Sequence, residues 1–261
     1  MSVHLEALAD DVFSAADAQA RTAVHVERFP FGEVRRSPDY PDLFFLNGIT
    51  QLRAPDWSAE DLERVLAEKL PGIASARVSS RDPQTIARLG PLLSEAGYQA
   101  ECRVAMIEVA ASEQPRPGIV VRPLETADDW RAFEGLVRGD AAEHGWTQAR
   151  SDQLVRLYLD GEKLAQQSWL LAFIDGQAVG YVGLYQHRTV GYLHALYTPG
   201  PARGRGVGSA LVVGTSGSAR ALGCERLTLQ CTRDSFLPGF YHRLGFRVVG
   251  EMWIWSRPAI A

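Results

Sequence analysis

Residues 203–208, Arg-Gly-Arg-Gly-Val-Gly, combine three glycines with two arginines in the second half of the chain. Glycines leave backbone N–H groups accessible, because no side chain obstructs an approaching ligand. A run with helical apolar spacing follows, and a helix N-terminus offers unpaired N–H donors and a partial positive charge. Arginine side chains add charge-assisted donors for phosphate oxygens. The stretch therefore predicts a pyrophosphate-binding loop, with a plain glycine-rich turn before a helix as the alternative.

A phenol follows at Tyr241, within the run Phe-Tyr-His-Arg-Leu-Gly-Phe at 240–246. A phenol with a pKa near 10 is neutral at pH 7 and can donate a proton to a leaving group of comparable basicity. Tyr241 is therefore the candidate general acid. The alternative is a core aromatic position beside Phe240 and Phe246.

Both stretches resemble signatures of the GNAT N-acetyltransferase superfamily. The family pattern Q/R-x-x-G-x-G/A falls on Arg203, Gly206 and Gly208, and its aromatic-Tyr-x-x-Leu-Gly-Phe run includes Tyr241. The two signatures occur in the family's order, with one expected strand between them, and cover about the C-terminal half of the chain. The resemblance implies acetyl-CoA as cosubstrate, direct acetyl transfer without an acyl-enzyme, and no metal. The glycine spacing differs from the G-x-G-x-x-G of dinucleotide sites.

The resemblance also implies which residues hold the coenzyme. Backbone groups at 196–198 would pair with the pantetheine arm, and an N–H there would polarise the thioester carbonyl. The implied coenzyme-binding residues are Leu196, Tyr197, Thr198, Arg203, Gly204, Arg205, Gly206, Val207, Gly208, Ser209, Asp234, Phe240 and Tyr241. Asp234 departs from the family, which commonly has Asn there, so one hydrogen bond to pantetheine must be inverted or lost.

The general base is less defined by the sequence. Glu143 lies in a polar segment where the family's acceptor loops usually sit, and His194 lies on the strand expected to meet the donor. Each is a candidate base. A solvated surface carboxylate, a structural histidine and a chain of water molecules are the alternatives.

Composition limits the partners. The 27 Lys and Arg against 31 Asp and Glu give a net charge of −4, with no basic block, so nucleic-acid or membrane attraction is not expected. Three scattered cysteines argue against a disulfide framework or a zinc site. The first residues lack the pattern of a signal peptide, and the apolar runs are too short to span a bilayer. We expect a cytoplasmic bacterial protein, a monomer or homodimer, with a small-molecule or peptide amine as acceptor.

Hydrophobic periodicity and capping signals predict alternating helices and strands. Helices are expected near 3–20, 58–70, 82–97, after Thr126, 151–159 and after 208, with a short helix before 245. Strands are expected at 24–34, 43–49, 75–79, 101–109, 119–123, 169–174, 178–185 and 249–255, with Asp175-Gly176 as a tight turn. These elements predict an α/β protein whose mixed, mostly antiparallel sheet is flanked by helices.

The chain also carries a faint internal repeat. Residues 111–118 have linker composition, which divides the chain into domains 1–115 and 117–261. Residues 92–98 occupy the place of 240–246, with Leu93 where the second half has Tyr241. The loop at 52–57 lacks the glycines of 203–208 and contains Pro55, which has no N–H. We therefore predict a degenerate, non-catalytic GNAT-like copy before the catalytic one, the alternative being a common α/β ending.

Two functions from different classes follow. The first is an N-acetyltransferase that moves the acetyl group of acetyl-CoA directly to a primary amine of an unidentified acceptor. The second is an acyl-CoA-binding regulatory module without turnover, motivated by Asp234 and by the undefined base. A tandem arrangement with an active second half also resembles mycothiol synthase, an amino-sugar acetyltransferase.

Overall fold

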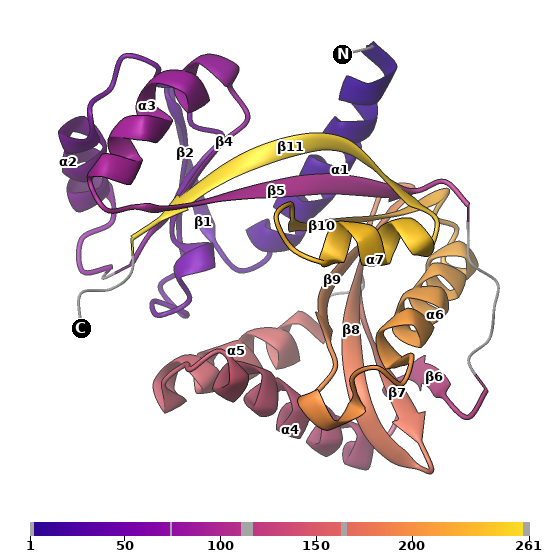
Figure 1. Cartoon of the computed structure of the whole chain (residues 1–261). Helices are drawn as coiled ribbons and strands as arrows, with labels where there is room; N and C mark the ends of the chain where they lie inside the picture. The colour runs from indigo at the N-terminus through magenta and orange to yellow at the C-terminus, as the bar shows by residue number, and fades with distance from the viewer. Residues whose placement is uncertain (1–2, 74, 111–116, 163–165, 258–261) are drawn as a thin grey trace. The chain divides into compact units, whose positions relative to one another are not determined.

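The computed structural model describes residues 3–73, 75–110, 117–162 and 166–257 (Figure 1). Contacts divide the chain into two compact units. Unit 1 contains 1–19, 105–231 and 236–250, and unit 2 contains 20–104, 232–235 and 251–261. Residues 111–116 of the predicted linker at 111–118 lie outside the described residues, and the division into domains 1–115 and 117–261 stays a prediction.

Helices and strands alternate along the chain (Figure 1). The helices are α1 (Val3–Arg21), α2 (Ala59–Lys69), α3 (Pro83–Glu95), α4 (Ala127–Glu143), α5 (Gln148–Glu162), α6 (Val207–Ala221) and α7 (Leu237–Arg243), with 3-10 turns η1 (Phe44–Leu46) and η2 (Gly200–Ala202). The strands are β1 (His25–Phe29), β2 (Gly32–Arg36), β3 (Gly48–Thr50), β4 (Arg77–Ser80), β5 (Gln99–Glu108), β6 (Val120–Pro123), β7 (Gln167–Ile174), β8 (Gln177–His187), β9 (Val190–Tyr197), β10 (Arg226–Thr232) and β11 (Phe246–Ser256).

In unit 1 the strand order is β11, β5, β10, β9, β8, β7, β6. Strands β6 to β9 pair antiparallel in sequence order, whereas β9 and β10 pair in parallel through the crossover helix α6. The sheet is therefore mixed and mostly antiparallel, as predicted.

Helices cover both faces of the unit 1 sheet. Adjacent strand residues point to opposite faces, and the neighbours Gly180 and Tyr181 show which helix lies on each. A Cβ at Gly180 would meet side chains of α6, while the Tyr181 ring packs edge-on to Phe133 of α4. The glycine lets α6 approach the strands closely, and α4 lies on the opposite face.

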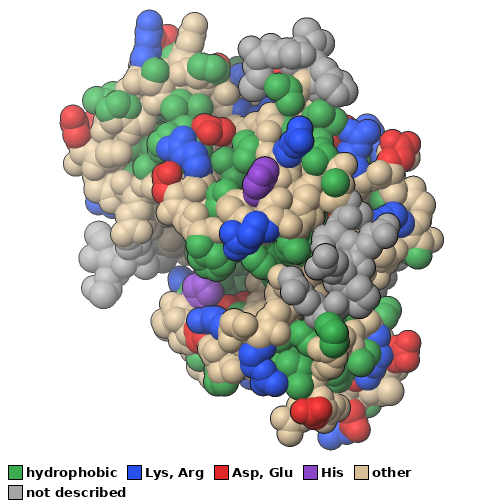
Figure 2. Space-filling model, turned by 45° about the vertical axis from the view of Figure 1, so that its right-hand side comes forward, with side chains coloured by type: hydrophobic (Ala, Val, Ile, Leu, Met, Phe, Trp, Pro, Cys, Tyr) green, Lys and Arg blue, Asp and Glu red, His purple; other side chains and the backbone are tan. Residues whose placement is uncertain are grey.

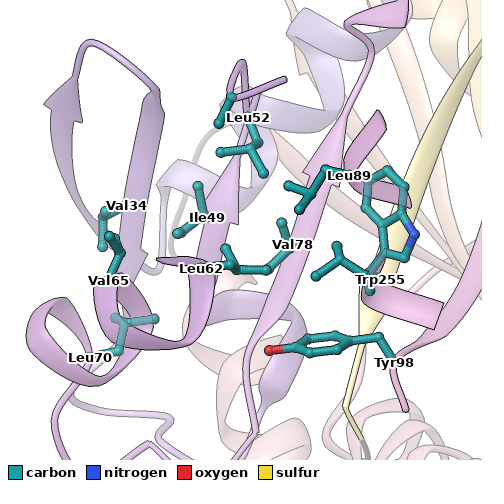
Figure 3. Packing of buried hydrophobic residues seen from close by; sticks show 12 residues of the cluster. Val34, Ile49, Leu52, Leu62, Val65, Leu70, Val78, Leu89, Tyr98 and Trp255 are labelled. Carbon is teal, nitrogen blue, oxygen red and sulfur yellow. The ribbon is translucent and has the colours of Figure 1, made fainter. Parts of the chain in front are cut away.

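In unit 2 the strand order is β1, β2, β3, β4, β11, β5. Strands β1 to β3 pair antiparallel, β3 and β4 pair in parallel through α2, and β11 pairs antiparallel with β4. The core lies between these strands and the helices α2 and α3. Trp255 is among its largest buried side chains, and it lies near Leu89 of α3 and Val78 of β4 (Figure 3).

Capping chemistry explains several helix starts. Thr126 caps α4 and Ser58 caps α2, each in a reciprocal capping box with an aspartate three residues on. Asp82 caps α3, with Pro83 at the first helical position. The tight turn between β7 and β8 is also confirmed, since Asp175 and Gly176 have φ of 50° and 78°.

The prediction of single strands at 24–34 and 43–49 was wrong. Residues 24–34 form a hairpin instead, in which Phe29 pairs with Gly32 across a two-residue turn. Gly32 has a φ of 144°, and Pro30 lacks the N–H that a strand interior needs. The segment 43–49 contains a 3-10 turn at 44–46, and β3 starts only at Gly48.

In the part of the chain that the structure describes, no helix is long and apolar enough to cross a membrane. On the face shown in Figure 2, basic and acidic side chains are interspersed rather than gathered into one-sign patches.

Candidate functional site

Strand β9 carries an irregularity in front of the predicted loop. Gly183 pairs with His194 and Tyr181 pairs with Tyr197, so β9 uses one residue more than β8 between these two pairs. This is a β-bulge, and Ala195 within it has a φ of 53°. The bulge lies where the sequence places the amides that would meet a thioester carbonyl, next to Leu196.

Strands β9 and β10 separate beyond the bulge. Their parallel register runs from the pair Val190–Arg226 to the pair Leu193–Leu229. Both strands continue, to Tyr197 and Thr232, without further pairs between them among the described residues. A peptide-like ligand arm can therefore pair with the freed strand edge, as in other cases of strand addition.

The loop that follows η2 presents a row of amides. Gly204 and Gly206 have φ of 75° and 87°, a left-handed backbone that other residues adopt only with strain. Gly206 is also the N-cap of α6 and provides no side chain to cap it. Among the described hydrogen bonds, none uses the backbone N–H of residues 204–209. An anion can therefore accept several hydrogen bonds here at once.

Gly208, in the first turn of α6, has no side chain, so Phe240 and Thr198 lie close to the helix backbone. A Cβ at this position would lie 3.5 Å from the Phe240 ring and 3.9 Å from the Thr198 hydroxyl oxygen. The structure thus brings together three predicted ligand-binding positions, from the end of β9, from α6 and from α7. The predicted residues Arg205, Val207 and Ser209 belong to the same loop and first helical turn.

Tyr241 of α7 is 5% exposed and lies edge-on to Phe240 and Phe246. Burial raises the pKa of Tyr241, with smaller contributions from Cys231 of β10 and Tyr192 of β9. The phenol stays protonated at neutral and mildly alkaline pH, as a proton donor requires.

Glu143 ends α4 and contacts the start of the loop. Its carboxylate accepts hydrogen bonds from the Tyr197 hydroxyl at 3.0 Å and the Gly200 N–H at 3.2 Å, and it pairs with the Arg203 guanidinium. The Gly200 N–H and Arg203 lower the pKa of Glu143. Burial and, after it, the hydrogen bond to Glu143 raise the pKa of Tyr197 to about 12.

His194 lies partly buried on β9, next to the bulge. Its Nε2 lies 3.1 Å from Gln167 Oε1, and its ring stacks on Tyr192 and meets Trp169 edge-on. Burial lowers the pKa of His194 to about 4, so the imidazole is neutral at pH 7. A neutral imidazole can accept a proton, but with this pKa it is a weak base.

One polar pair was missed by sequence reasoning. The Tyr181 hydroxyl donates to Asp140 Oδ2 at 2.8 Å, and burial raises the pKa of Asp140. Asp140 lies one turn before His144 on α4, and His144 Nδ1 lies 3.1 Å from Asp140 Oδ1. The sequence signal was the spacing of four residues between Asp140 and His144, which also occurs at ordinary solvated helix ends.

Asp234 belongs to unit 2, where it is exposed and pairs with its neighbour Arg233. It stays a sequence-based candidate. No group of three or more His, Cys, Asp or Glu side chains suited to a metal occurs among the described residues. The site of unit 1 therefore consists of a freed strand edge, a row of amides and a buried phenol.

Comparisons with known proteins concern the family and the fold of the chain. Residues 130–246 match the model of the acetyltransferase (GNAT) family. A glucosamine 6-phosphate N-acetyltransferase 1 from rice, Oryza sativa subsp. japonica, is 30% identical over 149 residues, which are 54% of this chain and 89% of that protein.

Two solved structures share the fold over nearly the whole chain. One is a functionally unknown conserved protein from Staphylococcus epidermidis, with a TM-score of 0.70, 13% identity, and coverage of 90% of this chain and 93% of the other. The second is a GCN5-related N-acetyltransferase from Kribbella flavida, with a TM-score of 0.63, 15% identity, and coverage of 96% and 95%.

Proposed function

The chain is an acyltransferase that belongs to the GNAT family, and on this premise we propose that it transfers the acetyl group of acetyl-CoA directly to a primary amine. The row of unused amides at 204–209 carries the proposal, because it can bind the coenzyme's pyrophosphate. Acetyl-CoA is the family's cosubstrate. In this proposal the pantetheine arm pairs with β9 where β10 has separated from it.

The residues divide the chemistry between them. The amine nitrogen attacks the thioester carbon, the C–N bond forms, and the C–S bond then breaks. A backbone N–H at the bulge, next to Leu196, stabilises the oxyanion of the tetrahedral intermediate. Tyr241 gives its proton to the departing thiolate, and the amine's proton goes to a base or to water.

For the base, His194 and water are the candidates that we retain. His194 adjoins the bulge, and its low pKa suits an acceptor amine that reaches the site already neutral. Glu143, the other sequence candidate, has its carboxylate engaged by Tyr197, Gly200 and Arg203.

An amino sugar phosphate is the first acceptor to test. The rice relative is named for glucosamine 6-phosphate, and its match covers 54% of this chain. The mycothiol-synthase-like alternative would have an amino-sugar conjugate as its acceptor.

The test measures binding and turnover separately. Calorimetry with coenzyme A should give a one-site isotherm. Thiol release from acetyl-CoA is then followed with glucosamine 6-phosphate, other amino sugars, peptide N-termini and lysine. We expect turnover with at least one amine class. Binding without any acetylated product would favour the regulatory module, and the absence of binding would contradict both proposals.

We also propose that unit 2 descends from a degenerate GNAT-like copy. Each unit has two antiparallel pairings followed by a parallel pairing through a helix, namely β1 to β4 with α2 and β7 to β10 with α6. A further helix then leads to a long strand, α3 to β5 and α7 to β11. The cytoplasmic location and the monomeric or dimeric state stay predictions.

A further inference from the structure

The end of α4 and the start of the pyrophosphate loop meet at one carboxylate. Glu143 Oε1 accepts hydrogen bonds from two donors, the Tyr197 hydroxyl at 3.0 Å and the Gly200 N–H at 3.2 Å. Its Oε2 pairs with the Arg203 guanidinium. Three contacts at 197, 200 and 203 tie the whole turn between β9 and the loop to a single side chain.

The Arg203 side chain forms hydrogen bonds with groups of the protein itself. Its Nε donates to the Thr198 carbonyl oxygen at 2.9 Å, while an Nη group pairs with Glu143. The Arg203 N–H also donates to the Gly200 carbonyl oxygen, at 3.1 Å. The arginine of the family pattern thus closes the turn at 198–203 through its side chain and its backbone.

The neighbouring backbone leaves room for this arrangement. Gly139 lies one turn before Glu143 on α4, and a Cβ there would lie 3.5 Å from the Tyr197 hydroxyl. A Cβ at Gly200 would lie 3.9 Å from Glu143 Oε1. Small residues on both sides allow the helix end, the tyrosine and the turn to meet.

We propose that Glu143 is a positioning residue that holds the pyrophosphate loop in its binding geometry, with Arg203 as an internal brace rather than a direct phosphate ligand. This inference rests on the proposed function. A row of amides binds an anion tightly only when its geometry is fixed beforehand, because ordering the loop on binding would cost affinity. The charged hydrogen bonds to Glu143 fix that geometry in the ligand-free protein.

A base at this position would leave a different signature. A general base needs a free lone pair near the amine and a pKa close to the working pH. The Glu143 carboxylate is engaged on both oxygens, and its pKa is lowered. A positioning residue affects coenzyme binding, whereas a base affects kcat and its dependence on pH.

The test is a double-mutant cycle with Glu143→Gln, Arg203→Gln and the double variant. Glu134→Gln is the matched control, because Glu134 lies on the same helix and pairs with Arg138 instead. We expect each single variant to weaken coenzyme A binding roughly tenfold, as for loss of a charged hydrogen bond. The double variant should be no weaker than the worse single variant, since both remove one interaction. The kcat and its pH profile should stay unchanged.

Three results would overturn the inference. A lower kcat and a lost acidic limb in Glu143→Gln, at unchanged coenzyme affinity, would make Glu143 a base. Additive losses with a much larger effect of Arg203→Gln would make Arg203 a phosphate ligand. Tighter coenzyme binding by Glu143→Gln would show that the carboxylate competes with the ligand.

Amide hydrogen exchange in the ligand-free protein separates this inference from the proposed function. Glu143→Gln should speed exchange at Gly200 and Arg203 relative to Glu134→Gln, whether or not coenzyme A binds. Unchanged exchange would contradict the brace by itself. A wild-type protein with slow exchange but no coenzyme binding would keep the brace and refute the proposed function.

Discussion

The segment from β9 to α6 in unit 1 and the segment from β3 to α2 in unit 2 have the same order of elements but different backbone donors. In unit 2 the amides of 52, 53 and 54 donate to Ser79 O, Phe31 O and Thr85 Oγ1 at 2.8–2.9 Å, and Pro55 has no N–H. In unit 1 no described hydrogen bond uses the amides of 204–209.

The later helices, α3 in unit 2 and α7 in unit 1, differ in the side chain that each carries at the corresponding position. In unit 2, α3 places Leu93 in the core, whereas α7 of unit 1 carries the buried phenol of Tyr241. The arrangement of strands and helices alone therefore does not make a binding site. Unpaired amides and one proton donor distinguish the segment that we expect to bind the coenzyme from the one that only packs.

The largest effect is expected at the phenol. Tyr241→Phe should lower kcat about 10²-fold or more, because the thiolate would leave without a proton donor. Coenzyme A affinity should change little. Thiol-release kinetics and calorimetry measure the two quantities.

Tyr98 of unit 2 is the matched control for Tyr241. Burial also raises its pKa, to about 12, but Tyr98 lies outside unit 1, and its hydroxyl donates to Glu63 of unit 2 at 3.3 Å. Tyr98→Phe should leave kcat unchanged. Equal turnover by Tyr241→Phe and the wild type would remove the assigned acid.

The next effect is on coenzyme binding. Gly206→Val forces a branched side chain into a φ of 87°, which costs about 1–2 kcal/mol and displaces the amides beside it. We expect coenzyme A affinity to fall about 10- to 100-fold by calorimetry.

Gly72 of unit 2 controls for backbone strain. It has a φ of 78°, and no atom lies within 4 Å of an added Cβ. Gly72→Val should reduce stability by a similar amount and leave coenzyme affinity intact. Similar binding losses in the two variants would mean that strain alone, rather than the amide row, explains Gly206→Val.

The capping boxes at Thr126 and Ser58 should contribute different amounts to the thermal stability of the protein. Asp129 is 5% exposed and pairs with Arg122 through both oxygens at 2.7–2.8 Å, whereas Asp61 is 40% exposed. We expect Asp129→Asn to lower Tm at pH 7 by about 2–8 °C, and Asp61→Asn by less. Thermal unfolding followed by circular dichroism measures both.

The pH dependence of that difference has a defined sign. Arg122 holds the pKa of Asp129 well below its usual range. Its stabilisation is present above the unfolded-state pKa near 3.9 and is lost as the pH falls below it. The Tm gap between Asp129→Asn and the wild type should therefore close in acid. A gap that widens in acid would contradict the assignment.

The smallest effect concerns His194. Its pKa of about 4 lies below the unfolded value near 6.5, so the folded state loses stability as the pH falls from 6.5 toward 4. Nitrogen NMR of the imidazole should show no titration between pH 5 and pH 8, and His194→Gln should flatten the stability change in that acid range. A midpoint near 6.5 would show that the imidazole is solvated.

Short-range chemistry made much of the fold predictable. A cap at Thr126, a cap at Asp82 and the turn at Asp175-Gly176 are each decided within four residues, and the structure confirms them. The loop at 203–208 was predictable for the same reason, because its glycines and the following helix are adjacent in sequence.

Long-range pairings were not predictable from one sequence. Nothing local shows that β4 takes β11 as its neighbour, with Trp253 opposite Ser80. The contact of Glu143 with Tyr197 joins residues 54 positions apart in the sequence. In the sequence alone, Glu143 resembles a solvated carboxylate at the end of an ordinary helix. Such contacts depend on how strands and helices assemble, so the contacts of Glu143 with the turn at 197–203 could be found only in the structure.

Amide NMR with coenzyme A tests the central claim most directly. We expect the backbone N–H resonances of 204–209 to shift on saturation, while those of 52–54 and 56–58 in unit 2 stay in place. Unmoved resonances at 204–209, or larger shifts at 52–54 and 56–58, would contradict coenzyme binding by the amide row.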